Sequence, residues 1–382
     1  MNRFSALDGL RGLACIIVVI YHYILSFFPS IIFNSNSQRH YNIESYLSDF
    51  PFIAFYNGHL SVIIFFVLSS FILSVYCIRN SYLLVPIFFK RYLRLMIPVL
   101  ISCVIAYIVV HSNLMFNTYI SDTTSAGFWL KKFYTNDFPG GFDSSILSLL
   151  QSSIFSIWNI NSSTAWNPVL WTMSYEFIGS IFIFIFFKIN SLFIRMSLYF
   201  ILIVFFINSY FFPFILGAIL AEIYINRSDI FLIVYKKFGI FIFISIIILS
   251  NIPPKMTNIF YGMEINFQII FHSICSLLII VVILNNNVIY NGLSNKFFLK
   301  MGSLSFSIYL LHFIILCSYS SWLFNLLFLL TESYMLSFFI SFITSLILIY
   351  YMALLFYKFI DNKAIILSQL SYIKLSKWSK LS

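Results

Sequence analysis

Long apolar runs dominate this sequence and limit the folds that the chain can adopt. We predict an all-α polytopic membrane protein with about ten transmembrane helices. Of the 382 residues, 61% are hydrophobic and only 9% are charged, whereas an ordinary globular protein is about 25% charged. The runs at 211–225 and 238–250 are short, so the predicted number of transmembrane helices would change most readily there, if one of these runs were split or merged with a neighbour. The runs are Leu10–Phe28, His59–Ile78, Leu95–His111, Pro168–Phe187, Leu192–Asn208, Phe211–Ile225, Phe238–Ser250, Ile265–Leu284, Met301–Ser320 and Tyr334–Tyr357.

Most of the positive charges lie in every second connection between runs, and these connections would all be on the same side of the membrane. With the N-terminus inside, eighteen of the 22 Lys and Arg residues fall on the cytoplasmic side, and the other four are Arg39, Lys131, Lys132 and Lys255. This asymmetry predicts that both termini are cytoplasmic. It also explains the net charge of +10 without a nucleic-acid partner. We expect residues 1–363 to form the membrane domain and residues 364–382 to form a basic tail at the membrane surface.

The five cysteines, Cys15, Cys77, Cys103, Cys275 and Cys317, all lie within apolar runs. Their spacing matches neither a metal site nor a disulfide framework, so we interpret them as small core residues. We expect no metal site. The first run lacks a cleavage site of small residues after it, which predicts that it remains as a helix.

The first apolar run carries two ionisable side chains, Arg11 at its leading edge and His22 inside it. Their spacing of eleven residues turns an α-helix by three full turns plus about 20°, so both side chains lie on nearly one face. They would be about 16 Å apart along the axis, roughly half of the hydrocarbon thickness. Separately, Arg11 could be an interfacial anchor and His22 a link between helices. Since neither role requires a shared face, we predict a functional site.

Two more arginines, Arg91 and Arg94, lie three residues apart in KRYLRLMIP, just before the third run. This spacing places them on one side of a helix start. One interpretation is an anchor at the cytoplasmic surface. The other is a pair that binds phosphate groups of a cytoplasmic donor, because guanidinium binds phosphate in a bidentate manner.

One carboxylate is expected deep in the membrane. Glu176 follows Pro168 by eight residues, which places it about 12 Å into that helix. Such a group must be protonated, paired or in a wet cavity. A buried ion pair is the structural alternative. Glu222 and His272 are weaker candidates for a site.

A polar stripe is predicted in MGSLSFSIYLLHF, where Ser305, Tyr309 and His312 follow the i, i+4, i+7 pattern of one helix face. Hydrogen bonding between packed helices is the alternative to a functional role. The longest predicted loop, Ser112–Asn167, faces outward and includes a Pro-Gly-Gly turn signal. Its tryptophans, Trp129, Trp158 and Trp166, either lie at the membrane interface or stack on sugar rings.

Six segments together resemble the motifs of the acyltransferase family 3 membrane proteins, in particular the standalone O-antigen and capsule O-acetylases. They follow the family order over nearly the whole chain. Ser70 stands where the family usually has Gly, Phe306 replaces a frequent Tyr, and Asp361 and Lys363 occupy the place of a common Glu-x-Pro. The segments are RFSALDGLRGLACIIVVIYHY with its Arg-x10-His spacing, NGHLSVIIFFVLSSFIL, KRYLRLMIP, WNPVLWTMSYEF, FPFILGAILAE and MGSLSFSIYLLHF.

The resemblance implies a membrane O-acyltransferase, with O-acetyl transfer expected. It would use acetyl-CoA, or another acyl-CoA, as the cytoplasmic donor, and the acceptor would be a hydroxyl of a surface or lipid-linked polysaccharide, undecaprenyl-linked in one version. The expected location is the bacterial inner membrane. The roles implied by position are catalysis by His22 with Arg11 and Glu176, donor binding by Arg11, Arg91 and Arg94, and substrate binding or support by Trp171, Ser305, Tyr309 and His312.

Two other functions stay open, a lipid-linked glycan polymerase and a non-enzymatic flippase of polysaccharide assembly. Neither needs a pair of arginines for a cytoplasmic CoA donor. For the acyltransferase, His22 would act either as a general base on the sugar hydroxyl or as a nucleophile that forms an acyl-imidazole. The sequence does not choose between these routes.

Overall fold

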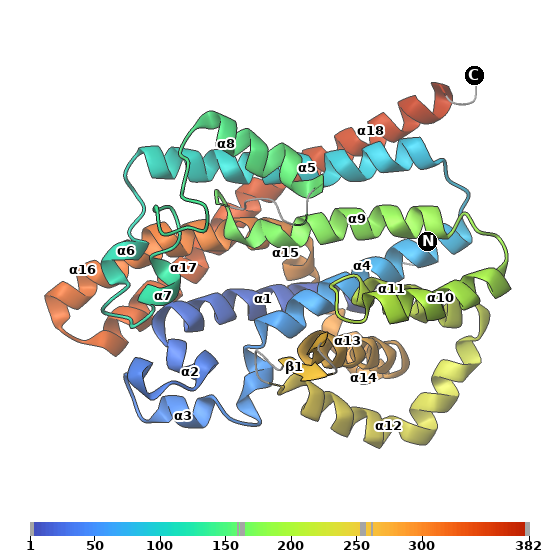
Figure 1. The fold of residues 1–382 in the computed structure, drawn as a ribbon, viewed down its shortest axis with the longest axis horizontal. Helices are drawn as coiled ribbons and strands as arrows, with labels where there is room; N and C mark the ends of the chain where they lie inside the picture. Colours follow the sequence, from blue (N-terminus) through green and yellow to red (C-terminus); the bar gives the residue numbers. More distant parts are fainter. Residues whose placement is uncertain (1–3, 159, 161–164, 253–256, 261–262, 379–382) are drawn as a thin grey trace. The chain divides into compact units, whose positions relative to one another are not determined.

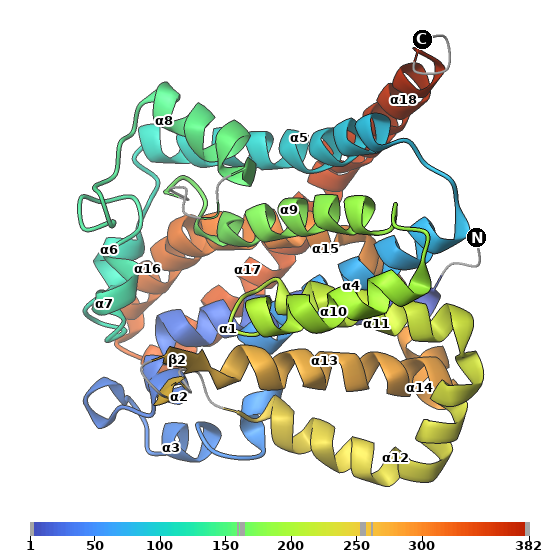
Figure 2. The same cartoon turned by 45° about the vertical axis from the view of Figure 1, so that its right-hand side comes forward.

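The computed structural model describes residues 4–158, 160, 165–252, 257–260 and 263–378. Over these residues the fold is helical apart from one antiparallel pair of strands, which aligns Thr257 with Asn266 (Figures 1 and 2). The elements in chain order are α1 (Ser5–Phe27), α2 (Pro29–Phe33), α3 (Ile43–Leu47), α4 (Gly58–Arg79), α5 (Leu84–His111), α6 (Asn117–Ile120), α7 (Gly127–Leu130), α8 (Ile146–Leu150), α9 (Trp171–Phe186), α10 (Leu192–Phe206), α11 (Phe212–Asn226), α12 (Ser228–Ser250), β1 (Thr257–Phe260), β2 (Met263–Asn266), α13 (Phe267–Asn285), α14 (Asn287–Leu293), α15 (Lys296–Ile315), α16 (Ser321–Thr331), α17 (Tyr334–Phe356) and α18 (Asn362–Trp378).

Shorter helical segments extend several of these helices. A 3-10 turn, η5 (Pro168–Leu170), leads into α9. The π-helical segments η6 (Leu316–Ser320) and η7 (Tyr357–Asp361) join α15 to α16 and α17 to α18. The remaining segments are η1 (Asn36–Gln38), η2 (Phe52–Phe55), η3 (Gln151–Phe155) and η4 (Ser156–Trp158).

Within the described residues, eight helices are long and apolar enough to cross a membrane by length and composition. This supports the predicted class, a polytopic helical membrane protein. Two more of the predicted spans are the shorter helices α10 and α11, with 15 residues each. Such a helix is about 22 Å long, less than the hydrocarbon thickness of about 30 Å. Crossing by α10 and α11, and with it the count of ten, stays a prediction.

Four helices begin five or more residues before their apolar runs, and two of them, α1 and α15, begin at Ser5 and Lys296 rather than at Leu10 and Met301. Helix α5 begins at Leu84 rather than at Leu95, and α12 begins at Ser228 rather than at Phe238. Hydropathy ends where Lys or Arg appears, but the backbone hydrogen bonds of a helix continue through such residues. Arg91 and Arg94 therefore lie inside α5 and not at its start.

The predicted outer loop, Ser112–Asn167, contains several helical segments. It contains α6, α7 and a continuous apolar helical segment, Ile146–Trp158, made of α8, η3 and η4. In both views α8 runs beside α5 (Figures 1 and 2), and the ring centroids of Trp158 and Tyr92 are 5.4 Å apart. Tyr92 lies only about 12 Å along α5 from its first residue. The end of the segment thus lies beside the first half of α5.

The chain divides into two compact units. Unit 1 comprises Met1–Val18, Asp49–Phe88 and Tyr175–Ser305, and unit 2 comprises Val19–Ser48, Phe89–Ser174 and Phe306–Ser382. Helices α1, α5, α9 and α15 contribute residues to both. The groups around each candidate residue are therefore described within its own unit.

Close backbone contact holds the first turns of α1 in unit 1. A Cβ atom added to Gly302 of α15 would lie 2.1 Å from the carbonyl oxygen of Asp8, and one added to Gly12 would lie 2.6 Å from the amide nitrogen of Gly302. A Cβ atom on Gly9 would lie 1.9 Å from the carbonyl oxygen of Leu293. Helices in a bilayer approach this closely only through small residues.

Unit 2 holds the second half of α1 through hydroxyl groups and aromatic rings. The hydroxyl of Tyr23 lies 2.7 Å from Ser320 Oγ, which lies 2.7 Å from Ser345 Oγ of α17. Phe27 packs against Phe324 and Phe338, with ring centroids 5.0 and 5.4 Å away. These contacts fix the rotation of α1 about its axis next to His22.

We predict that Gly302→Ala lowers the thermal unfolding midpoint of the detergent-solubilised protein, because the new methyl group overlaps the backbone of α1 and overpacking costs about 1–3 kcal/mol. Gly292→Ala is the matched control, since a Cβ atom there meets nothing within 4 Å. Intrinsic fluorescence during heating measures both. Equal midpoints for the two variants would contradict the close contact.

Candidate active site

Two imidazoles form the centre of the polar groups in unit 2. His22 Nδ1 on α1 lies 3.0 Å from His312 Nε2 on α15, and the ring centroids are 5.0 Å apart. His312 is fully buried, whereas His22 keeps part of its surface accessible. The two predicted residues, 290 positions apart in sequence, are therefore direct partners.

The other contact of His312 decides which nitrogens carry protons. His312 Nδ1 lies 3.1 Å from the carbonyl oxygen of Ile308. A carbonyl only accepts, so His312 Nδ1 is the donor. In its neutral form, His312 has the lone pair on Nε2 and accepts a hydrogen bond from His22 Nδ1. A neutral His22 then has its own lone pair on Nε2.

Hydroxyl and amide groups surround this pair on α15 and at the start of α9. The Tyr309 hydroxyl lies 2.8 Å from Thr172 Oγ1 and donates to the carbonyl oxygen of Val169 over 2.7 Å. Asn167 Nδ2 donates to the carbonyl oxygen of Leu310 over 2.9 Å. These bonds connect α15 to the start of α9 within one helical turn of His312.

Asn167 has an additional property. The residue has an exposed fraction of 0%, and its Oδ1 atom is buried without a hydrogen-bond partner. Its orientation is set by Nδ2, which donates to Leu310 and to Ser102 Oγ. A buried acceptor without a partner costs free energy, and here it lies beside the helix that carries His312. Trp171, the predicted supporting residue, begins α9 four residues later and is half-buried.

An aromatic side chain from the segment after α5 lies against His22. The ring of Trp129 in α7 is nearly parallel to the imidazole, at 11°, with centroids 6.0 Å apart. Phe133 and Phe313 approach the indole perpendicularly at 5.0 and 5.5 Å. Of the three tryptophans predicted in the outer loop, this is the one next to the imidazole pair.

Unit 2 also contains the two arginines of α5. Arg94 forms an ion pair with Asp361, whose exposed fraction is 1%, and its guanidinium lies over the Phe306 ring at 5.6 Å. Arg91 is half-buried on the same helix. The partner of Arg94 is the residue that departs from the family pattern, and it binds one terminal nitrogen of the guanidinium.

The other predicted residues belong to unit 1. Arg11 lies 3.6 Å from Asp8, one turn earlier on α1. Glu176 accepts a hydrogen bond from Ser69 of α4. Ser305 Oγ donates to the carbonyl oxygen of Gly302 in its own helix, while its carbonyl accepts from Cys15 over 3.2 Å. Within units, therefore, His312 and Tyr309 join the surroundings of His22, whereas Arg11, Glu176 and Ser305 have separate partners.

Comparison with known proteins agrees with the motifs. The family model described as an acyltransferase domain matches residues 4–354. The chain belongs to the acyltransferase 3 family. Comparisons with curated proteins and with solved structures found no match. The chain is therefore a membrane acyltransferase, and the imidazole pair lies in the matched part of it.

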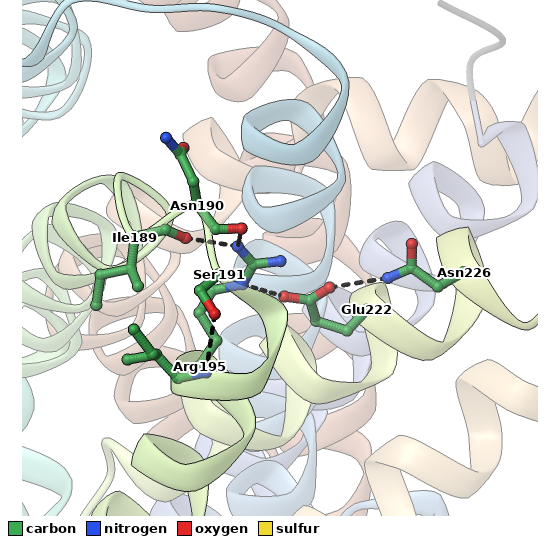
Figure 3. A network of polar contacts seen from close by, with 7 residues as sticks. Ile189, Asn190, Ser191, Arg195, Glu222 and Asn226 are labelled. Carbon is green, nitrogen blue, oxygen red and sulfur yellow. Dashed lines mark hydrogen bonds and ion pairs between the residues drawn. The ribbon is translucent and has the colours of Figure 1, made fainter.

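A second polar network of this acyltransferase is structural. Arg195 Nε donates to Glu222 Oε1 over 2.6 Å, and Asn226 Nδ2 donates to Glu222 Oε2 over 3.0 Å (Figure 3). A terminal nitrogen of Arg195 also donates to the carbonyl oxygens of Ile189 and Asn190 (Figure 3). Both carboxylate oxygens of Glu222 accept hydrogen bonds. This weaker candidate for a functional site therefore has a structural role, because its network links α10, α11 and the residues that follow α9.

The other weak candidate, His272, belongs to a second imidazole pair, in unit 1. Its Nδ1 lies 2.7 Å from His59 Nδ1, and its Nε2 lies 3.2 Å from Asn57 Nδ2. His59 Nε2 in turn lies 3.3 Å from the Tyr210 hydroxyl. His59 was not predicted as a functional residue, although it lies in the motif NGHLSVIIFFVLSSFIL. In the described part of the chain, no group of three or more His, Cys, Asp and Glu side chains could hold a metal ion.

We predict that His312→Ala lowers the acyl-transfer rate by about 10- to 100-fold at equal protein level, the range found for side chains that orient a functional histidine. His22 loses the acceptor for its Nδ1 proton, so the pH dependence of kcat/KM should change as well. In His312→Gln, the amide oxygen can accept the hydrogen bond from His22 Nδ1. This variant should therefore recover part of the acyl-transfer rate. An unchanged rate and pH profile in His312→Ala would refute the positioning role.

Proposed function

We propose that this acyltransferase is an O-acetyltransferase that moves an acetyl group from cytoplasmic acetyl-CoA to a hydroxyl of a surface or lipid-linked polysaccharide, in the bacterial inner membrane. One observation carries the proposal. The hydrogen bond between His22 and His312, within a chain of this family, orients an imidazole that keeps accessible surface. The family favours this function over the polymerase and the flippase.

Direct transfer balances as follows. The lone pair of His22 Nε2 takes the proton of the acceptor hydroxyl while its oxygen forms a bond to the thioester carbonyl carbon. The C–S bond then breaks, and the imidazolium returns the proton to the CoA thiolate. In the two-step route, Nε2 bonds to the carbonyl carbon as the C–S bond breaks and CoA leaves as its thiolate. The acceptor oxygen then bonds to the same carbon as the C–N bond breaks, and the hydroxyl proton passes to the thiolate. Both routes use the same nitrogen, so the His312 contact serves either one.

Donor binding is proposed for Arg91 and Arg94, with Arg11 and Glu176 completing the active site as the family resemblance implies. The ion pair with Asp361 is compatible with a donor role for Arg94, because it engages one terminal nitrogen and the guanidinium has further N–H groups that could bind phosphate. The alternative for Arg94, a purely structural pair, has the same geometry. Arg91 is therefore the cleaner residue to test.

We predict that His22→Ala abolishes transfer of labelled acetyl from acetyl-CoA to carbohydrate in membranes that contain equal amounts of protein. Loss of the base or nucleophile should cost at least about 10²-fold. His111→Ala is the matched control, since this exposed histidine lies at the end of α5 and stacks on Tyr107 at 3.9 Å. Activity retained by His22→Ala would exclude the site.

A further prediction concerns the donor. Arg91→Ala should raise the KM for acetyl-CoA by about tenfold, the loss of about 1.4 kcal/mol expected when one charge-assisted phosphate contact is removed. The KM for acetyl-pantetheine, which has no nucleotide phosphates, should stay constant. Equal changes for the two donors, or a change in acceptor KM alone, would contradict phosphate binding by Arg91.

Arg94 needs a paired design, because Arg94→Ala would leave the buried Asp361 without its countercharge, a strongly destabilising change. The double variant Arg94→Gln with Asp361→Asn removes both charges together. Its donor KM should rise in the same way if Arg94 binds phosphate.

A further inference from the structure

We propose that the indole of Trp129 is the platform on which the carbohydrate acceptor stacks beside His22. The inference rests on the proposed function, and it names the subsite that presents the sugar hydroxyl to the imidazole. It starts from the parallel arrangement of the two rings, 11° between planes and 6.0 Å between centroids.

If the two rings are in contact, part of the indole extends beyond the imidazole. At a contact spacing of about 3.5–4.0 Å between ring planes, a centroid distance of 6.0 Å implies a lateral offset of about 4.5–5 Å. Trp129 and His22 both keep accessible surface, although their common neighbour Phe313 is buried. A sugar ring that lies on the projecting part of the indole would be in the same layer as the imidazole.

This placement suits the chemistry of a carbohydrate. One face of a pyranose presents C–H groups, which pack on an aromatic face, while the hydroxyl groups project from the edge of the ring. A hydroxyl at that edge would point toward the edge of the imidazole, where the nitrogens are. The platform therefore orients the acceptor without using the polar groups that orient His22.

The platform is held rigidly by the residues around it. Asn117 Nδ2 donates to the carbonyl oxygens of Leu130 and Phe133 over 2.8 and 3.0 Å, which closes α7 against α6. The amide nitrogen of Phe116 donates to the carbonyl oxygen of Cys317 over 2.8 Å. Cys317 follows His312 in the same continuous helical segment, so the platform and the imidazole pair share one support. A rigid aromatic anchor loses little entropy on binding.

The other two tryptophans of the segment lack this relation to His22. Trp166 has an exposed fraction of 0%, and its carbonyl accepts from the Tyr134 hydroxyl over 3.3 Å. Burial raises the pKa of Tyr134 well above its usual value, so that this hydroxyl stays protonated. Trp158 is 46% exposed but packs on Tyr92 of α5. Trp158 is therefore a matched control, an accessible tryptophan of the same segment whose ring lies against Tyr92.

The stacking has one competing explanation. An indole face over His22 could instead stabilise the imidazolium through a cation–π interaction. That role would act on the reaction step and its pH dependence, whereas a platform acts on acceptor affinity. Steady-state kinetics with both substrates varied separates the two.

The experiment uses the full-length protein in membranes, labelled acetyl-CoA, and polysaccharide from cells that lack the gene, treated with mild alkali to remove esters. Trp129→Ala and Trp129→Leu are expected to raise the acceptor KM by about tenfold or more, the equivalent of one lost stacking contact. The KM for acetyl-CoA and the pH profile of kcat should match the wild type. Trp129→Phe should recover most of the affinity, and Trp158→Ala should behave as wild type.

An unchanged acceptor KM in Trp129→Leu overturns the platform, as does a shifted pH profile of kcat with an unchanged acceptor KM. Trp129→Leu keeps apolar bulk, which protects the test if Trp129→Ala does not fold. If the wild-type protein does not acetylate the polysaccharide, the proposed function fails and the platform with it. If the wild type does so and Trp129→Leu has normal acceptor KM, the platform alone fails.

Discussion

A polar side chain inside apolar surroundings must find its partner within the protein, and this requirement organises the functional part of the chain. The hydrogen bond from His22 Nδ1 to His312 Nε2 meets it for two imidazoles at once. The carbonyl of Ile308 accepts from the other nitrogen of His312, so that a neutral His312 accepts from His22 Nδ1. The same contacts that satisfy the buried groups therefore orient the His22 imidazole.

The polar networks of the molecule differ in how they end. Around Glu222, each carboxylate oxygen has a donor, and the arrangement joins helices. Around His272, a series of hydrogen bonds runs from the Asn57 amide through the two imidazoles to the Tyr210 hydroxyl, which can accept the last of them. The network through His312 instead leads to His22, which lies beside the indole of Trp129.

Several features of the fold were predictable from local pattern and several were not. The apolar runs identified α4, α13 and α17 nearly to the residue, because a bilayer-length apolar helix needs no tertiary information. The early start of α5 was missed because charged residues end a hydropathy run without ending a helix. The apolar segment Ile146–Trp158 was read as part of a loop, since its packing along α5 depends on Tyr92, a residue far away in sequence.

The sequence by itself determined the class of protein, the family and the shared helix face of Arg11 and His22, since composition, motif order and the period of a single helix are local properties. Only the tertiary structure decided which polar group meets which. Residues separated by 290 and 267 positions, His22 with His312 and Arg94 with Asp361, become neighbours, and Trp129 comes to lie on the imidazole. Helix packing selects these partners, and packing depends on the surfaces of whole helices, which no single segment encodes.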